Sequence, residues 1–317
     1  MIFLILFCLV LLSYTPKPLF SVIDLYPIEA KLTKPHNYSA IEKKSQATKD
    51  IQYSSLYPNS MLDIYSPKGA TEKLPIILFV HGGGFFKGEK EMAKYFGPTI
   101  SSDRYIFVSI NYNLVPSTTI FDQVRQVNEA LRFIIDNADE YSLDVDRINL
   151  SGSSAGGFLA LQLASAYYDK DYAELLKLNP VNGVTINSLL LYSAVYDLSE
   201  FQSFEGNIFS KYLLSKMGWG LTGIKGWQQD KNLGELLNLN KYRRQDFPPV
   251  FITDGNTQTF TEQASNYANE LKKMNVPVQT LFFDSKEKVG HGYQLKMDSQ
   301  ASEKAVKSSV EFLNRWN

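Results

Sequence analysis

Two glycine-rich motifs carry the residue types that acyl transfer requires. One reads His-Gly-Gly-Gly-Phe at residues 81–85, directly after the apolar run 76–80. Successive glycines let backbone N–H groups turn toward a developing oxyanion. The other reads Gly-Ser-Ser-Ala-Gly-Gly at residues 152–157, directly after the strand expected at 148–150. A sharp strand-to-helix turn at such a motif exposes a serine hydroxyl, so we predict Ser154 as a nucleophile.

The general base follows from the small number of histidines. The chain contains three, of which His36 lies in a polar stretch and His81 belongs to the first glycine motif. His291 stands between two glycines just after the strand expected at 278–283, where a loop leaves its imidazole ring free. We therefore predict that His291 accepts the proton of Ser154.

In these motifs the chain resembles the hormone-sensitive lipase-like esterases of the α/β-hydrolase superfamily, from about residue 62 to the C-terminus. The segment Asn-Tyr-Asn-Leu-Val-Pro at residues 111–116 is similar to that family's tyrosine-containing Arg-Leu-Ala-Pro segment. Ser153 stands where the family more often has aspartate. Kynurenine formamidases and feruloyl esterases have a similar elbow.

The resemblance implies roles for backbone and side-chain groups around Ser154. The N–H groups of Gly83, Gly84 and Ala155 would form the oxyanion hole. Phe85 and Tyr112, which lie in or beside the family-like segments, are expected to bind substrate.

The triad acid is the position at which this sequence departs from the family. The family's register for the acid falls on Gln258, a neutral amide that could orient an imidazole but could not stabilise its charged form. Asp254, at the end of the apolar run 250–253, is the favoured candidate, because strand ends in this fold face the site. Glu262 and Asp197 are alternatives, although Asp197 is also placed to cap Ser199.

The rest of the chain predicts the fold that must position these residues. Short, fully apolar runs alternate with stretches of helical periodicity, which indicates a mostly parallel sheet covered by helices on both faces. We expect strands near residues 76–80, 106–110, 147–150, 188–192, 250–253 and 278–283, and helices near 124–135, 155–164, 261–274 and 302–316. An antiparallel strand pair is expected at the sheet edge, from about residue 51 to the turn at 66–69.

The segment from about residue 200 to 244 interrupts this alternation. It is rich in aromatic and aliphatic residues, among them Phe201, Phe204, Phe209, Trp219 and Trp227. Such side chains favour an apolar surface, so we predict a small helical cap over the site. The α/β-hydrolase domain with this insertion is expected to span residues 51–317.

The N-terminal residues predict export or membrane anchoring. Residues 2–12 are apolar without interruption, which is shorter than the about 20 residues of an ordinary spanning helix. Residues 1–15 are therefore interpreted as a signal peptide or an N-terminal anchor, with a secreted, periplasmic or membrane-anchored protein as the consequence. Residues 16–50 are interpreted as a polar linker or surface segment.

Composition excludes several other classes of function. The 317 residues carry 32 basic and 33 acidic side chains, without the basic stripe that nucleic-acid binding needs. Cys8 is the one cysteine, so the folded body holds no intramolecular disulfide and no thiol nucleophile. No metal or organic cofactor is expected.

Together these features predict a serine carboxylesterase that acts on small to medium, moderately apolar esters through an acyl-enzyme. An amidase or formamidase with the same residues is one alternative. A binding protein that kept the fold but lost its acid is another.

Overall fold

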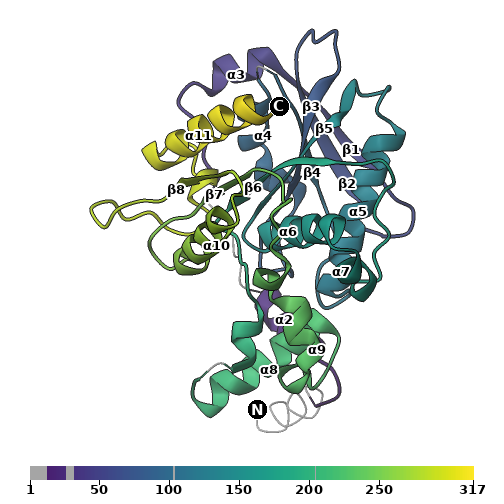
Figure 1. Ribbon diagram of the computed structural model, residues 1–317, viewed down its shortest axis with the longest axis vertical. Coiled ribbons are helices and arrows are strands. Elements are labelled where there is room, and N and C mark those ends of the chain that lie inside the picture. The colour runs from purple at the N-terminus through teal and green to yellow at the C-terminus, as the bar shows by residue number, and fades with distance from the viewer. Residues whose placement is uncertain (1–12, 26–31, 103, 204) are drawn as a thin grey trace.

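A twisted eight-stranded sheet forms the centre of the molecule (Figure 1). The computed structural model describes residues 13–25, 32–102, 104–203 and 205–317. The strands are β1 (Ser45–Gln52), β2 (Met61–Pro67), β3 (Leu74–Val80), β4 (Ile106–Ile110), β5 (Leu143–Ser153), β6 (Ile186–Tyr192), β7 (Val250–Thr253) and β8 (Val278–Leu281). Their order across the sheet is β1-β2-β4-β3-β5-β6-β7-β8, and every pair from β4 to β8 is parallel.

Helices cover both faces of this sheet. The described α-helices are α2 (Lys17–Asp24), α3 (Tyr38–Lys44), α4 (Phe96–Ser101), α5 (Ile120–Asp136), α6 (Ala155–Tyr168), α7 (Lys170–Leu175), α8 (Ile208–Thr222), α9 (Lys231–Leu237), α10 (Thr261–Lys273) and α11 (Gln300–Trp316). Helices α4 and α11 pack on one face, and α5, α6 and α10 belong to the layer on the other. The α/β-hydrolase architecture predicted from the alternation of apolar runs and helical periods is confirmed.

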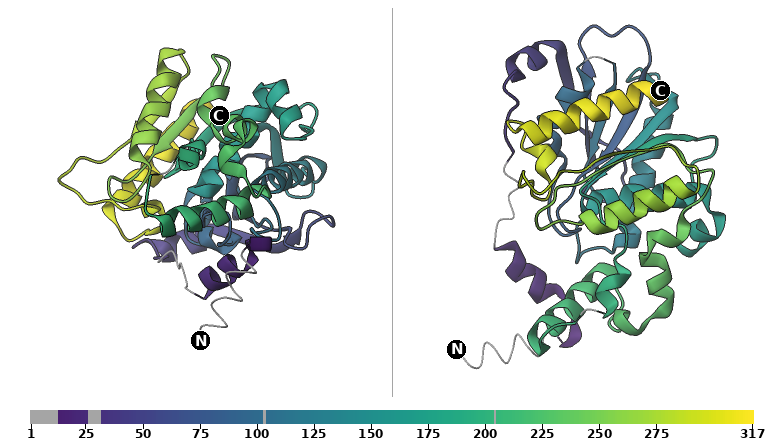
Figure 2. Two further views of the ribbon diagram at one scale, coloured as in Figure 1. Left: turned by 90° about the horizontal axis from the view of Figure 1, so that it is seen from below. Right: turned by 60° about the vertical axis from the view of Figure 1, so that its left-hand side comes forward.

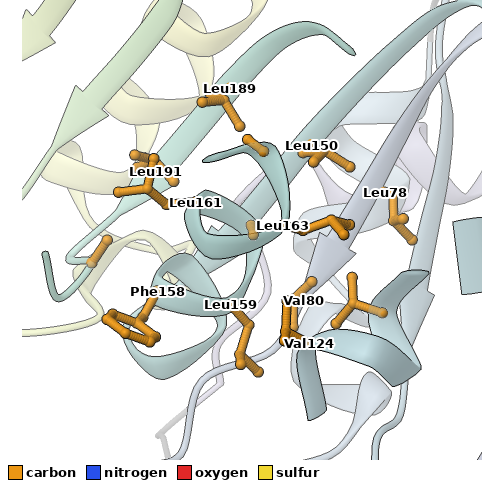
Figure 3. Packing of buried hydrophobic residues seen from close by; sticks show 14 of the residues in the cluster. Leu78, Val80, Val124, Leu150, Phe158, Leu159, Leu161, Leu163, Leu189 and Leu191 are labelled. Atoms are coloured by element: carbon orange, nitrogen blue, oxygen red, sulfur yellow. The ribbon is translucent and has the colours of Figure 1, made fainter. Parts of the chain in front are cut away.

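The alternation of side chains along β3 shows why helices must lie on both faces. Ile76, Leu78 and Val80 belong to the cluster that includes α5 and α6, whereas Ile77 and Phe79 belong to the cluster that includes α4 and α11. Figure 3 shows Leu159, Leu161 and Leu163 of α6 packed with leucines of the strands, and Val124 of α5 beside Val80 of β3. Because α6 is enclosed in this way, almost its whole surface is buried and apolar.

The parallel strands place the predicted chemistry at one edge of the sheet. Strands β3, β5, β7 and β8 all run in the same direction, and the loops that follow them carry the glycine motif, Ser154, Asp254 and His291. Ligand sites in such sheets lie beyond the carboxyl ends of the strands.

Residues 16–50, interpreted as a linker or surface segment, lie mostly at the surface where they are described, but they are not an unstructured linker. This segment contributes two helices, α2 and α3, and the edge strand β1. Strand β1 pairs antiparallel with β2 from Ser45 onward, so the expected edge pair begins six residues earlier than predicted. Most side chains of β1 are exposed to solvent, because the strand lies at the edge of the sheet. Its sequence therefore lacks an apolar pattern.

The insertion between β6 and β7 forms helices, as the aromatic content predicted. Helices α8 and α9 and three short 3-10 turns (Ser199–Ser203, Trp227–Gln229 and Leu239–Tyr242) occupy it. Helix α2 packs against α8, and both panels of Figure 2 show this N-terminal helix beside the insertion. Phe20 of α2 is buried and lies edge-on to Phe86, so the N-terminal region is part of the cap. Phe204 lies outside the described residues.

The expected signal or anchor falls largely outside the described residues, since residues 1–12 are not among them. Within the described ranges, no helix combines the length and apolar character needed to cross a membrane.

A buried ion-pair cluster joins the edge strands to the turn that follows the glycine motif. The Lys90 ammonium lies 2.8 Å from Asp63 Oδ1 and 2.8 Å from Asp50 Oδ1. Asp63 is fully buried in β2 and Lys90 is almost fully buried, whereas Asp50 is exposed. The Lys49 ammonium lies 3.8 Å from the other carboxylate oxygen of Asp63, so the Lys90–Asp63 pair is the buried part of this cluster.

We predict that Lys90→Ala strongly destabilises the fold. Removing the ammonium breaks the buried Lys90–Asp63 pair and leaves the half-exposed Lys49 ammonium, 3.8 Å away, facing the Asp63 carboxylate. Breaking a buried pair costs about 3–5 kcal/mol in comparable cases. Urea unfolding would measure this loss. Lys73→Ala, which removes the exposed Lys73–Asp139 pair, is the matched control and should hardly move the midpoint. Equal effects of the two substitutions would contradict the role of Lys90.

Candidate active site

Ser154 occupies a strained turn between β5 and α6. Its backbone angles are φ 55° and ψ −121°, a region that residues with a side chain rarely adopt. The turn fits only because glycines flank it. A Cβ atom on Gly152 would lie 2.2 Å from Gly156 O, and one on Gly156 would lie 2.1 Å from Val80 O. The helix amides of α6 point toward the site, which favours negative charge at its N-terminus.

The Ser154 hydroxyl contacts His291 directly. Ser154 Oγ lies 2.8 Å from His291 Nε2, although 137 positions separate the two residues in the sequence. The histidine loop is held on its other side by a hydrogen bond from Gly292 N to Ser193 Oγ, at 3.2 Å. This geometry allows His291 to take the serine proton without rearrangement.

The other imidazole nitrogen contacts a threonine. His291 Nδ1 lies 2.9 Å from Thr259 Oγ1, and that hydroxyl donates to Asp254 Oδ1 at 2.5 Å. Asp254 is fully buried at the end of β7 and also accepts the N–H of Gly255. The favoured acid thus lies on the correct side of the ring, but it reaches the ring through Thr259.

The alternative acids lie elsewhere. Gln258 has φ 52° and is exposed, and within the described part of the chain it makes no hydrogen bond to His291. Glu262 is exposed at the start of α10. Asp197 accepts hydrogen bonds from the backbone and the hydroxyl of Ser199, the capping arrangement that the sequence suggested.

Burial shifts the pKa values of both ionisable groups. Burial raises the pKa of the Asp254 carboxyl above 3.8, and the hydroxyls of Thr259 and Ser193 oppose that rise. Desolvation lowers the pKa of His291 below 6.5, and the charge of Asp254 opposes that decrease. His291 is therefore neutral and able to accept a proton at pH values above its ordinary pKa.

The glycine loop after β3 lies next to the nucleophile. Gly83 and Gly84 have φ values of 117° and 63°, and a Cβ on Gly83 would lie 2.1 Å from Lys87 O. Among the described residues, no acceptor pairs with the N–H groups of Gly83, Gly84 or Ala155. Buried N–H groups normally find a partner, so unpaired ones beside a nucleophile suit a developing oxyanion.

His81 and Tyr112 support this loop from behind. Their rings stack at 4.2 Å, and the Tyr112 hydroxyl donates to His81 O at 2.9 Å. Burial lowers the pKa of His81 to about 4, so its ring stays neutral. The expectation that Tyr112 binds substrate is not met, because the ring is fully buried and lines neither cavity beside Ser154.

Two cavities meet at Ser154. The first, of about 250 Å³, is almost wholly apolar and lies under the cap. It is lined by Phe85, the residue expected to bind substrate, and by Gly84, Phe86, Ile120, Ala155, Val195, Leu198, Phe201, Leu214, Met217, Gly218, Leu221, Thr222, Trp227, Leu237 and Phe260. The second, of about 310 Å³, is bordered by the glycine loop, His291, Lys87 and Lys296.

Sequence reasoning missed the side chains that position the histidine loop. Asn256 bonds to the backbone of that loop at Glu287 and Val289, and its own N–H donates to Val289 O. Gln294 donates to Ser153 Oγ, at the position where the related family more often has aspartate. No sequence pattern indicated a role for Thr259, because a threonine five residues after Asp254 is ordinary in a loop. Within the described ranges, no group of three acidic, histidine or cysteine side chains could hold a metal ion.

Comparison with known proteins gives the family. The family model BD-FAE matches residues 62–271, which include the glycine loop, Ser154 and Asp254. The chain belongs to the BD-FAE family. The predicted resemblance to esterases of the α/β-hydrolase superfamily is confirmed.

Individual relatives share a small fraction of their residues with this chain. A kynurenine formamidase of Drosophila melanogaster is 23% identical over 272 residues, 81% of this chain and 79% of that protein. An isoprenylcysteine α-carbonyl methylesterase of Arabidopsis thaliana is 29% identical over 116 residues, 36% of this chain and 27% of that protein. Esterase B from Lactobacillus rhamnosis is similar in structure, with a TM-score of 0.76 and 19% identity over 90% of both chains.

The chain spans less than two thirds of the length of several relatives. It covers 61% of a 25% identical protein of Acanthamoeba polyphaga mimivirus, as well as the smaller share of the plant methylesterase. These likenesses place the fold.

We predict that this BD-FAE protein does not tolerate a side chain at Gly156. Gly156→Ala forces a Cβ against the backbone oxygens of Val80 and His81, so the turn or β3 must shift. Unfolding free energy should fall by about 1–3 kcal/mol or more, as for other overpacked sites. Gly226→Ala is the control, because its nearest neighbour would be a flexible side-chain atom 3.9 Å away. Matching unfolding midpoints for the two variants would show that the close approach is not a constraint.

Proposed function

We propose that the protein is a serine carboxylesterase that hydrolyses small to medium, moderately apolar esters. One observation carries the proposal: Ser154 Oγ lies 2.8 Å from His291 Nε2, and Ser154 lines an apolar cavity. Beside it are backbone N–H groups for which the described residues provide no acceptor. A nucleophile, its base and oxyanion donors around one cavity constitute a site for acyl transfer.

The proposed reaction runs through an acyl-enzyme. Ser154 attacks the ester carbonyl while His291 takes its proton, and the N–H groups of Gly83, Gly84 and Ala155 stabilise the oxyanion. His291 then protonates the leaving alcohol and later activates a water molecule that releases the acid. The cavity lined by Phe85 would hold the acyl group, and the cavity beside His291 would hold the alcohol.

Hydrolysis of formamides is the second candidate. The same residues serve ester and amide chemistry, and a kynurenine formamidase is among the relatives that align over most of the chain. Faster turnover of an N-formyl anilide than of p-nitrophenyl acetate would favour it over the esterase.

We predict that Ser154→Ala abolishes hydrolysis of p-nitrophenyl acetate, with a loss in kcat of at least about 10⁴-fold, as for other nucleophile deletions. The melting temperature should stay nearly unchanged, because the hydroxyl serves chemistry and little packing. A fluorophosphonate probe should label wild type and fail to label the variant. Ser153→Ala, whose hydroxyl faces Gln294, is the control and should still be labelled. Labelling of Ser154→Ala would overturn the nucleophile assignment.

We further propose that the N-terminal segment directs export or holds the protein on a membrane. Residues 2–12 are apolar in sequence. Among the described residues, Val22 of α2, Leu25 just after α2, and Ile208 and Phe209 of α8 are exposed, and α2 packs against α8. Exposed apolar side chains, together with an apolar N-terminal sequence, suit a lipid surface.

This localisation predicts that cells expressing the full chain keep it out of the soluble cytoplasmic fraction. A chain lacking residues 1–15 should move to that fraction, as measured by fractionation and immunoblotting. Recovery of the full chain wholly in the soluble cytoplasmic fraction, with residues 1–12 intact, would refute the proposal.

A further inference from the structure

The Thr259 hydroxyl bridges a buried carboxylate and the candidate catalytic base. It lies 2.5 Å from Asp254 Oδ1 and 2.9 Å from His291 Nδ1. On the far side of the ring, His291 Nε2 contacts Ser154 Oγ at 2.8 Å. Four side chains therefore form one continuous chain of hydrogen bonds.

The direction of each bond in this chain follows from Asp254. An ionised carboxylate only accepts hydrogen bonds, so the single hydroxyl proton of Thr259 points to Asp254. Thr259 Oγ1 can then contact His291 only as an acceptor, which requires a proton on Nδ1. The neutral ring consequently carries no proton on Nε2, and this nitrogen is free to accept the proton of Ser154.

We propose that Thr259 is a positioning residue. Because it donates its hydroxyl proton to Asp254, it can only accept a hydrogen bond from His291 Nδ1, and this fixes the imidazole tautomer that accepts the Ser154 proton. The inference rests on the proposed serine hydrolase function. In it, an indirect, hydroxyl-bridged acid takes the place of an acid bound directly to the ring.

The loop that carries Thr259 is fixed in a way that favours the bridge. Asn256 ties this loop to the histidine loop through its side chain and backbone, and Thr257 pairs with Gly290 across the two segments. Thr261 donates to Gly255 O, which closes the loop at the start of α10. The Phe260 ring lies edge-on to the imidazole at 5.5 Å, so neighbouring residues of one loop hold the ring by a hydrogen bond and by packing.

The charges near His291 are few. Among the described residues, Asp254 is the charged group that shifts the pKa of His291. It raises this pKa and so opposes the lowering caused by desolvation. Lys87 and Lys296 border the cavity on the other side of the ring. Thr259 itself is uncharged, so its removal and the removal of the Asp254 charge should have different effects on pH dependence.

Three variants test the bridge. Thr259→Val keeps the shape and removes both hydrogen bonds, so kcat for p-nitrophenyl acetate should fall by about 10²-fold or more, toward the 10⁴-fold cost of a wrong tautomer, with KM little changed. Thr259→Ser restores the hydroxyl and should return kcat to within about fivefold of wild type. Thr257→Val should behave as wild type, because the Thr257 hydroxyl bonds to Asn256 and not to His291, and the substitution keeps the backbone pairing of Thr257 with Gly290.

The pH profile separates the bridge from the charge. Asp254→Asn removes the charge that raises the pKa of His291, so the acid limb of kcat/KM should move to lower pH. Thr259→Val leaves that charge in place and should lower kcat with the acid limb near its wild-type position. A purely structural role for Thr259 would not produce this split, nor rescue by serine.

Nitrogen NMR of the histidines gives a measurement that does not depend on turnover. In wild type, His291 should be protonated at Nδ1 and not at Nε2 above its pKa, and Thr259→Val should yield a mixture of tautomers. If wild type neither turns over esters nor reacts with a fluorophosphonate, the proposed function fails, while the tautomer of His291 still tests the bridge. Thr259→Val with an unchanged tautomer, with more than about a tenth of wild-type kcat, or without rescue by Thr259→Ser would overturn the inference.

Discussion

The close approach of two backbone segments at Gly156 is the constraint on which the candidate site depends. The turn after β5 packs so tightly against the end of β3 that no side chain fits between Gly156 and the carbonyl oxygens of Val80 and His81. This contact sets Ser154 beside the glycine loop, and it places the N-terminus of α6 next to the position of an oxyanion. A parallel β3–β5 pair is what brings both loops to one edge.

The base side of the site depends on a second join between loops. Asn256 and Thr257 attach the loop after β7 to the loop after β8, and the imidazole of His291 is held by Thr259 and Phe260 of the first loop. Proton transfer needs this geometry to within a fraction of an ångström. The two loops, rather than either alone, therefore determine how the base is presented to Ser154.

The cap extends this arrangement into an apolar cavity. Helices α8 and α9 close one side, and the N-terminal helix α2 supports them through Phe20, whose ring meets Phe86 at the end of the glycine loop. A Cβ on Gly220 of α8 would meet the Phe20 ring, so α2 and α8 are in close contact. Helix α2 and the insertion helices thus lie together at one end of the molecule (Figure 2).

The sequence by itself determined the fold class, most strand positions and the residues Ser154 and His291, because apolar periodicity and strand–turn–helix glycine motifs are local patterns. Only the tertiary structure decided what binds His291 Nδ1, since Thr259 and His291 lie 32 positions apart and meet through two tied loops. The burial of Tyr112 and the place of α2 in the cap likewise depend on contacts between segments far apart in the sequence. A hydrogen-bond partner depends on distances of about 3 Å between segments far apart in the chain, and local residue patterns do not encode such distances.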